Sequence, residues 1–249
     1  PEFSACGQAG ERVCLLSRGE LIPLPQGSRL FFLPDRFPVG FDNVKGGFEE
    51  LRDFYPVVAF VPPGYTGLYC AAFKERKGAF TLPLFSYSPV AVVDGVFSVP
   101  AVRIDRRKNH DLNALDVGLL RRKTRAFKST KNRLIRHLVD CALTNFCPNA
   151  VNLFFGKYEC PLPVSPYCNA RCLGCISFQP KGGSCPATQP RLTFVPTPQE
   201  LAEVALMHIR SVRSAVVSFG QGCEGEPLLQ ADIIKEAIQL IRRKTSRGT

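Results

Sequence analysis

The sequence predicts an α/β protein in which a β-rich N-terminal part is followed by helices and then by alternating strands and helices. Two observations support this prediction. Over residues 20–104, short β-branched and aromatic runs are separated by Pro and Gly, a pattern typical of strands joined by turns. Over the last third of the chain, short apolar runs that suit strands alternate with amphipathic helical stretches, which is typical of a parallel sheet.

Three parts of the chain follow from these patterns. We expect a β-rich domain over residues 1–105, a basic helical segment over residues 106–150 and an α/β part over residues 151–249. With 249 residues, of which 45% are hydrophobic, the chain is long enough to bury more than one core. No apolar run reaches the length of about 18 residues that a membrane helix needs, so no membrane partner is expected.

The expected N-terminal domain consists of short antiparallel strands. Asp94-Gly95 is a suitable two-residue hairpin turn, so the last two strands should pair with each other. The strands are expected at residues 29–33, 57–61, 68–73, 80–85, 90–93 and 96–104.

Residues 112–143 carry helix formers with few breakers, which predicts one long helix or two consecutive helices. Ser129 or Thr130 could cap a second helix, Pro148 should end the helical segment, and residues 151–155 should resume as a strand. One face is apolar and comprises Phe127, Leu134, Ile135, Leu138, Val139 and Ala142. The other face is basic and comprises Arg121, Arg122, Lys123, Arg125, Lys131, Arg133 and Arg136.

The basic face has two interpretations. The net charge of the chain is +11, and its basic residues concentrate between positions 103 and 136. Such a surface attracts nucleic acid, an acidic peptide or an acidic protein surface. Charged helix faces are more commonly only solvated, and this segment has neither interleaved aromatic residues nor a nucleic-acid-binding signature.

The C-terminal part is expected to hold two strand–loop–helix units. The chain from residue 158 contains three prolines that keep it extended, so the cysteines that follow should lie in a loop after a strand. Thr197 and Glu200 form a capping box, with proline at the first helical position. A second strand is expected at residues 215–219 and a last helix at residues 230–244. Functional loops should therefore lie at the C-terminal ends of the two strands.

Three cysteines with the spacing C-x3-C-x2-C are the residues that most clearly require a cofactor. They are Cys168, Cys172 and Cys175. Three thiolates this close together can hold three irons of a 4Fe-4S cube and leave the fourth iron open to a non-protein ligand. The chain has eleven cysteines, an odd number in a long sequence, which favours a reducing cytoplasmic location over a disulfide framework.

The cysteine loop and a second turn after the next strand, Glu224-Gly225-Glu226-Pro227, together resemble the motifs of the radical S-adenosylmethionine (radical SAM) superfamily. The resemblance covers the chain from about residue 158 onwards. It implies that the three cysteines bind a 4Fe-4S cluster. It also implies that the turn binds SAM, with Gly225 and Glu226 at the amino group and Glu224 in place of the family's usual first glycine.

The resemblance further implies an enzyme that takes an electron from a reducing donor and cleaves SAM to methionine and a 5'-deoxyadenosyl radical. Its fold would be a partial TIM-like barrel, because the chain holds only two strand–helix units, and we therefore expect an N-terminal fragment of a longer enzyme. Gly174 stands where the family usually has an aromatic residue, which Phe178 or Tyr167 could supply nearby. The motifs assign neither the substrate nor a catalytic residue.

Other uses of the cysteines stay open. Cys185 could be the fourth ligand of a structural zinc site with the loop cysteines, and Cys185-Pro186 also resembles ferredoxin-type sequences. The protein would then be a non-catalytic binding module, stabilised by zinc or iron–sulfur, whose basic helix contacts nucleic acid or protein.

The remaining cysteines and the histidines are expected to pack rather than to bind metal, since free cysteine is commonly buried. An alternative is a second cluster formed by Cys141, Cys147 and Cys160. Cys223 is expected to be an incidental small residue, and His110, His137 and His208 to be packed or partly exposed. The cysteines expected to be buried are Cys6, Cys14, Cys70, Cys141, Cys147 and Cys160.

Overall fold

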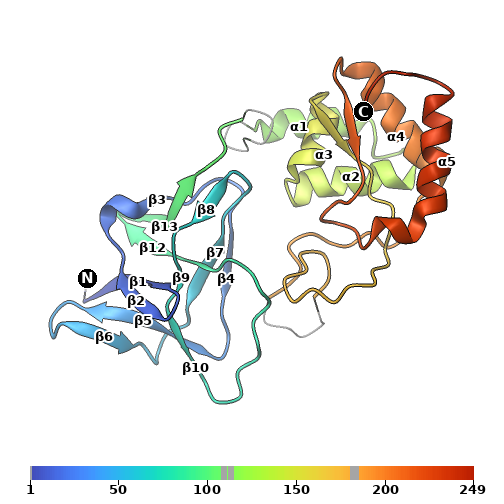
Figure 1. The fold of residues 1–249 in the computed structure, drawn as a ribbon. Helices are drawn as coiled ribbons and strands as arrows, with labels where there is room; N and C mark the ends of the chain where they lie inside the picture. The colour runs from blue at the N-terminus through green and yellow to red at the C-terminus, as the bar shows by residue number, and fades with distance from the viewer. Residues whose placement is uncertain (1, 108–110, 112–114, 180–184) are drawn as a thin grey trace. The chain divides into compact units, whose positions relative to one another are not determined.

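The computed structural model describes residues 2–107, 111, 115–179 and 185–249 of the chain (Figure 1). The chain divides into two compact units. The N-terminal unit contains the described residues up to 107 with Asp111, Cys185 and Pro186, and the C-terminal unit contains residues 115–179 and 187–249. The structure is mixed α/β, with a β-rich N-terminal part and five α-helices among the described residues, and these residues form no closed barrel.

The N-terminal unit is built from antiparallel strands in three sheets. The first sheet has the order β10-β5-β1-β2, and β6 also pairs with β5 and β9 with β1. The second has the order β11-β7-β4. The third has the order β12-β13-β3, and β8 also pairs with β13. The strands are β1 (Phe3–Ala9), β2 (Arg12–Leu15), β3 (Leu21–Pro23), β4 (Arg29–Phe32), β5 (Arg36–Asp42), β6 (Gly47–Glu50), β7 (Val57–Phe60), β8 (Tyr65–Gly67), β9 (Cys70–Ala71), β10 (Phe73–Glu75), β11 (Ser88–Pro89), β12 (Ala91–Val93) and β13 (Val96–Arg103).

The hairpin predicted at Asp94-Gly95 is confirmed. Val93 pairs with Val96, and both turn residues have positive φ, 51° at Asp94 and 79° at Gly95. Two positive φ values are the requirement of the tight hairpin turn that matches the twist of its strands.

The strand predicted at residues 80–85 is wrong, because this segment has no strand pairing. Pro83 lies in its middle and has no N–H to donate to a neighbouring strand. The apolar residues of the segment are used for packing instead. Leu82 and Phe85 lie against a core cluster that includes Leu33 and Val58.

In the C-terminal unit, three helices precede the first strand. They are α1 (Val117–Arg125), α2 (Arg133–Thr144) and α3 (Pro148–Phe155). The remaining elements are β14 (Glu159–Pro161), α4 (Pro198–Ser211), β15 (Val216–Ser218), the 3-10 helix η3 (Pro227–Gln230) and α5 (Ala231–Arg242). The two consecutive helices, the capped helix, the strand near residue 217 and the last helix are thereby confirmed.

The strand predicted at residues 151–155 is wrong: these residues form most of α3. Pro148 was expected to end a helix, but it occupies the first turn of this one, where its missing N–H costs nothing. A short apolar run has no periodicity that separates a strand from a buried helix. Gly156, with φ 62°, ends the helix in the left-handed conformation, and the strand begins after it, at β14.

Helices α2 and α4 begin at side-chain caps. Thr197 accepts a hydrogen bond from the N–H of Glu200 (3.1 Å), and the carboxylate of Glu200 accepts one from the N–H of Thr197 (2.8 Å), which confirms the capping box of α4. For α2, neither Ser129 nor Thr130 is the cap. Asn132 fills that position, and its Oδ1 accepts a hydrogen bond from the N–H of Ile135 (3.1 Å).

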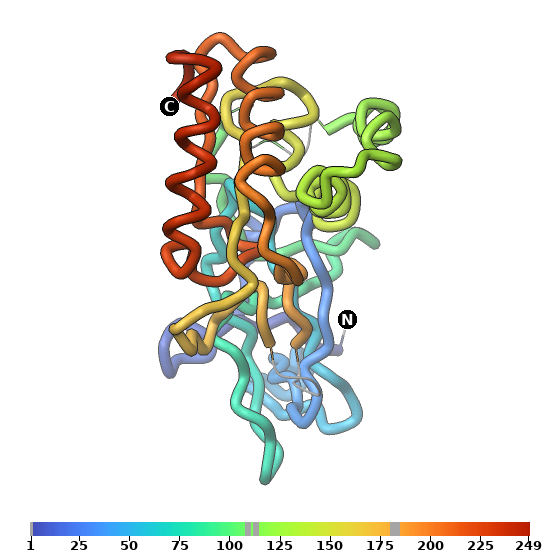
Figure 2. Tube along the Cα trace, turned by 90° about the vertical axis from the view of Figure 1, so that its right-hand side faces the viewer, coloured from blue at the N-terminus to red at the C-terminus, as the bar shows by residue number. Residues whose placement is uncertain are grey.

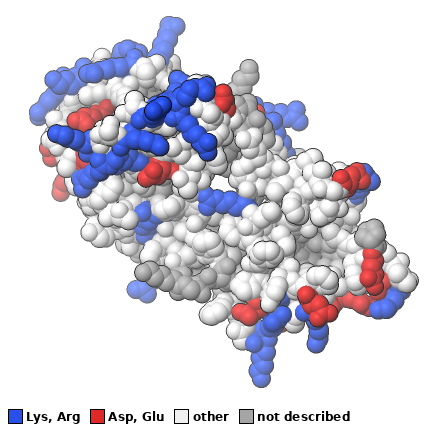
Figure 3. Space-filling model, turned by 180° about the vertical axis from the view of Figure 1, so that it is seen from behind, with Lys and Arg blue, Asp and Glu red and all other residues white. Residues whose placement is uncertain are grey.

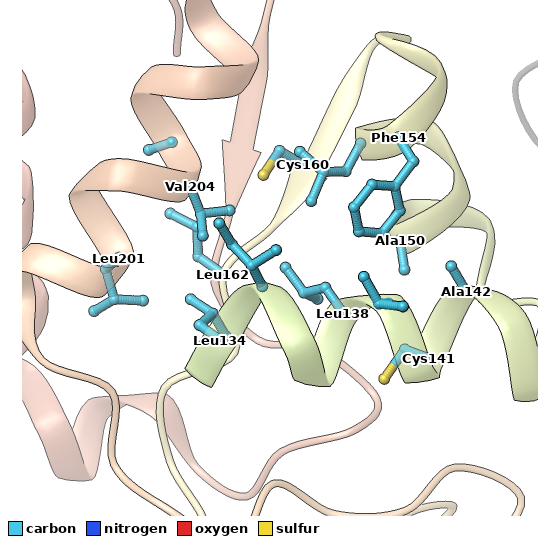
Figure 4. Close-up of a cluster of buried hydrophobic side chains, with 14 of the residues drawn as sticks. Leu134, Leu138, Cys141, Ala142, Ala150, Phe154, Cys160, Leu162, Leu201 and Val204 are labelled. Atoms are coloured by element: carbon cyan, nitrogen blue, oxygen red, sulfur yellow. The ribbon is translucent and has the colours of Figure 1, made fainter. Parts of the chain in front are cut away.

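The core of the C-terminal unit lies where α2, α3 and α4 meet the parallel strands. Leu138 of α2, Phe154 of α3, Leu162 after β14 and Val204 of α4 point toward one another (Figure 4). His208 of α4 is fully buried, as expected for a packed histidine, and its Nε2 lies 3.2 Å from the carbonyl oxygen of Tyr158.

The strands β14 and β15 pair in parallel, with Cys160 opposite Val217. Helix α4 connects them, and α5 follows β15 and lies beside α4 (Figure 2). Because parallel strands end at the same edge of a sheet, the loops that follow β14 and β15 emerge next to each other.

Basic side chains gather on one face of the C-terminal unit (Figure 3). The exposed ones on and near α1 and α2 are Arg121, Arg122, Lys123, Arg125, Lys128, Lys131 and Arg136. Arg133 is different, because its guanidinium pairs with Glu200 at 2.7 Å. Among the described residues, no helix combines the length and apolarity needed to cross a membrane.

Candidate functional site

The two sequence motifs follow the two parallel strands and are bonded to each other. The cysteine loop comes after β14, and the turn around Gly225 comes after β15. The N–H of Gly225 donates to the carbonyl oxygen of Ser165 (2.7 Å), and the N–H of Glu226 donates to that of Tyr167 (2.8 Å). The turn is therefore fixed against the residues that lead directly into Cys168.

Gly225 is required by this close approach. A Cβ at position 225 would overlap the carbonyl group of Tyr167 and would lie 3.1 Å from the Cβ of Cys168. The overlap is with backbone atoms, so no change of side-chain rotamer could relieve it. The resemblance placed Gly225 in the turn expected to bind SAM. The structure supplies a separate, steric reason for glycine at this position.

Glu224 joins the two loops from inside the protein. The residue is only 4% exposed. One carboxylate oxygen accepts hydrogen bonds from the N–H groups of Val164 (2.7 Å) and Ser165 (3.0 Å). The other accepts from Gly220 (2.9 Å) and Gln221 (2.7 Å). A buried carboxylate with four backbone donors holds both strand ends in one geometry, which is a positioning role.

Glu226 has a different environment from Glu224. It is half-buried, and its Oε1 accepts a hydrogen bond from the N–H of Leu228 (3.0 Å) at the start of η3. Glu226 therefore lies at the surface of the turn that Glu224 anchors.

The three loop cysteines differ in exposure. Cys168 and Cys172 are exposed, whereas Cys175 is half-buried. The N–H of Cys175 donates to the carbonyl oxygen of Cys172 (3.2 Å), so these two residues share a tight turn. Three thiols on one loop at the edge of a sheet are the ligand types that a 4Fe-4S cluster with one open iron takes. In the part of the chain that the structure describes, however, their donor atoms are not a group that lies within 4.8 Å of one another.

Arg191, which no sequence pattern indicated, lies in the same connection between β14 and α4 as the cysteine loop and contacts that loop. Its Nη2 donates to the Sγ of Cys175 (3.2 Å) and its Nε donates to the Oγ of Ser177 (3.0 Å). The guanidinium carbon also lies 5.1 Å from the ring centre of Phe178. Arg191 lies 16 residues after Cys175 and belongs to no motif spacing that could have identified it.

The surroundings of Cys175 favour its thiolate form. Burial raises the pKa of this thiol, but hydrogen bonds from Ser177 and from the Phe178 backbone, together with the charge of Arg191, outweigh burial and leave the pKa below its ordinary value. A lowered thiol pKa favours metal binding, because the thiolate is the ligand.

A second set of donor atoms converges elsewhere in the C-terminal unit. Within the described ranges, His137, Cys141 and Cys223 are the group of metal-ligand side chains whose donor atoms all lie within 4.8 Å of one another. Sequence patterns favoured a role other than metal binding for all three. The proximity of Cys141 and burial both raise the pKa of Cys223. The alternative cluster of Cys141, Cys147 and Cys160 is not such a group in the part of the chain that the structure describes.

Cys185 is part of the N-terminal unit. It is 1% exposed and packs with Leu33, Val58 and Tyr87, and the hydroxyl of Tyr87 lies 3.6 Å from its Sγ. Burial raises the pKa of this thiol. Its place in a hydrophobic core argues against the zinc arrangement in which Cys185 completes the loop site.

Comparisons with known proteins give no relative for this chain. No protein-family model matches it, and neither does any curated protein or solved structure.

Proposed function

We propose that this chain is a radical SAM enzyme, or the N-terminal part of one, that binds a 4Fe-4S cluster through Cys168, Cys172 and Cys175. The observation that carries the proposal is the pair of backbone hydrogen bonds from Gly225 and Glu226 to the start of the cysteine loop. Two loops that are distant in sequence meet at one sheet edge, which is where parallel α/β proteins bind their ligands.

Each residue of the site has a role in this proposal. The three thiolates would hold three irons and leave one iron for SAM. With both groups bound, the site would supply reductive cleavage of SAM to methionine and a 5'-deoxyadenosyl radical. Gly225 lets the turn approach the loop, Glu226 offers a carboxylate to the amino group of SAM, and Glu224 holds both loops in place.

The partial barrel and the location belong to the same proposal. The order β14, α4, β15, α5 would be the first two strand–helix units of a TIM-like barrel. All eleven cysteines are free thiols, which supports a location in the reducing cytoplasm. The substrate stays unassigned, because no described residue in or near the two loops selects one.

Anaerobic reconstitution with iron and sulfide tests the proposal. We expect a brown protein with about four irons per chain, which consumes SAM when a strong reductant is added. Cys172→Ala should lose the cluster absorption and the SAM cleavage. Cys70→Ala, which removes an exposed thiol of the N-terminal unit, should keep both.

A colourless protein after reconstitution would contradict the cluster. If the wild-type chain instead held zinc at the loop and Cys172→Ala removed it, the non-catalytic binding module with its basic helix would replace the enzyme as the explanation.

A further inference from the structure

We propose that His137, Cys141 and Cys223 form a second metal site, separate from the cysteine loop, that binds Zn²⁺ through one imidazole and two thiolates. The inference does not rest on the proposed function, because none of these three residues belongs to the C-x3-C-x2-C motif.

The distances suit a tetrahedral ion. The Nε2 of His137 lies 3.4 Å from the Sγ of Cys141, and all three donor atoms lie within 4.8 Å of one another. Zinc bonds of about 2.0–2.1 Å to nitrogen and about 2.3 Å to sulfur place neighbouring ligand atoms of a tetrahedron about 3.5–3.8 Å apart. Small side-chain movements would therefore bring the three donors to bonding distance.

The ligands come from rigid elements. His137 and Cys141 are four residues apart on α2, so their side chains lie on one face of the helix. Cys223 lies in the turn after β15, where its carbonyl oxygen accepts a hydrogen bond from the N–H of Leu192 (2.7 Å). The next residue, Glu224, is anchored by its four hydrogen bonds, so both parts of the site are held before any metal binds.

The donor types select the metal. Two sulfurs and one nitrogen suit Zn²⁺, whereas Mg²⁺ and Ca²⁺ require oxygen ligands. Cys141 and Cys223 are each 3% exposed, and His137 is half-buried. Three protein ligands leave the fourth position of a tetrahedral ion to water.

A bound ion would link α2 to the turn that contains Gly225. Among the described contacts, the ring of His137 also meets Phe194 edge-on, with centroids 6.5 Å apart. The metal would add a cross-link between two segments that are 82 residues apart at Cys141 and Cys223. Such a link stabilises the folded chain by the free energy of metal binding.

The test uses the full chain with Cys168, Cys172 and Cys175 all changed to Ala, so that the loop cannot bind zinc. This protein is expected to retain one zinc per chain after dialysis, measured by elemental mass spectrometry. Substitution by Co²⁺ should give thiolate-to-metal charge-transfer absorption. Absence of bound zinc, or a cobalt spectrum without that absorption, would overturn the proposal.

Variants in the same background identify the ligands. His137→Gln and Cys223→Ser should each weaken zinc binding by more than about 100-fold, since loss of a direct ligand should exceed the effect of losing an outer-shell partner. Cys70→Ala should bind zinc normally. His137 is half-buried, so its variant should keep the helical circular dichroism even if Cys223→Ser does not fold. A folded His137→Gln variant with unchanged zinc affinity refutes the site.

Discussion

At the residue scale, the candidate site depends on a few backbone contacts. Gly225 and Glu226 donate to the carbonyl oxygens of Ser165 and Tyr167, and the carboxylate of Glu224 binds four N–H groups. These contacts position the start of the cysteine loop.

Gly225→Ala should destabilise the C-terminal unit by about 1–3 kcal/mol, the cost of overpacking a close contact. The new methyl group would overlap the carbonyl group of Tyr167. Urea unfolding followed by circular dichroism measures the effect. Gly19→Ala is the matched control, because a Cβ there meets no atom within 4 Å and the residue does not need a positive φ. Equal midpoints for the two variants would show that the turn can move away from the loop.

Arg191→Met should lower the reduction potential of a reconstituted cluster by on the order of tens of millivolts, because hydrogen bonds and charge at the ligand sulfurs help to set that potential. The guanidinium donates to the Sγ of Cys175, and its positive charge favours the reduced, more negative cluster. A redox titration followed by electron paramagnetic resonance measures this change. Arg213→Met, in the exposed turn before β15, should leave the potential unaltered. An unchanged reduction potential in Arg191→Met would show that Arg191 does not interact with the cluster.

At the element scale, features with local causes were predictable. The Asp94-Gly95 hairpin and the Thr197 capping box were found because a few adjacent residues determine them. The strand predicted at residues 151–155 failed because the same apolar run satisfies a buried helix that begins with Pro148. Strand β1, which contains Ser, Gly and Gln, carries no strong β pattern, and besides the adjacent β2 it pairs with β5 and β9, which are far along the chain.

The site was predictable only in part for the same physical reason. Cys168, Cys172 and Cys175 share one loop, so their spacing was visible in the sequence. The approach of Arg191 to Cys175 depends on how the long connection between β14 and α4 folds back on itself, and that of Cys223 to His137 depends on packing between segments that are distant in sequence.

The ion pair between α2 and α4 gives a pH-dependent stability. Hydrogen bonds from Arg133 lower the pKa of Glu200 to about 2, despite the opposing effect of burial. Because the folded-state pKa lies below the unfolded value of 4.5, the stabilisation is present above about pH 4.5 and is lost as the pH falls toward 2.

Glu200→Gln should therefore cost about 1–2 kcal/mol at pH 7, a range that allows for solvent screening of the partly exposed Arg133. The difference from the wild-type protein should shrink toward zero near pH 2. Chemical unfolding at a series of pH values tests this, with Glu236→Gln on exposed α5 as the control. A difference that stays constant between pH 7 and pH 2 would exclude the ion pair as its cause.

At the scale of the whole molecule, segments of the two units alternate along the sequence. Cys185 lies after the cysteine loop in sequence, yet it is part of the core of the N-terminal unit. A single cut in the sequence would therefore not separate the units cleanly.

Cys185→Ala should destabilise the N-terminal unit by about 1 kcal/mol, because it removes a buried sulfur that packs with Leu33 and Val58. Hydrogen exchange should show weaker protection of β4 and β7 and unchanged protection of β14. Cys14→Ala, at a half-exposed position, should leave the protection of all three strands unchanged. Uniform loss of protection in both units would mean that they unfold together.

The four hydrogen bonds of Glu224 have a consequence for how the site tolerates mutation. They join the start of the cysteine loop, at Val164 and Ser165, to the turn after β15, at Gly220 and Gln221, through backbone N–H groups only. Substitutions of Asn169, whose side chain lies at the exposed surface, should therefore be accepted freely in a saturation library. Position 224 should accept almost no other residue, so the most restricted position of the site would be a buried acid rather than an exposed one.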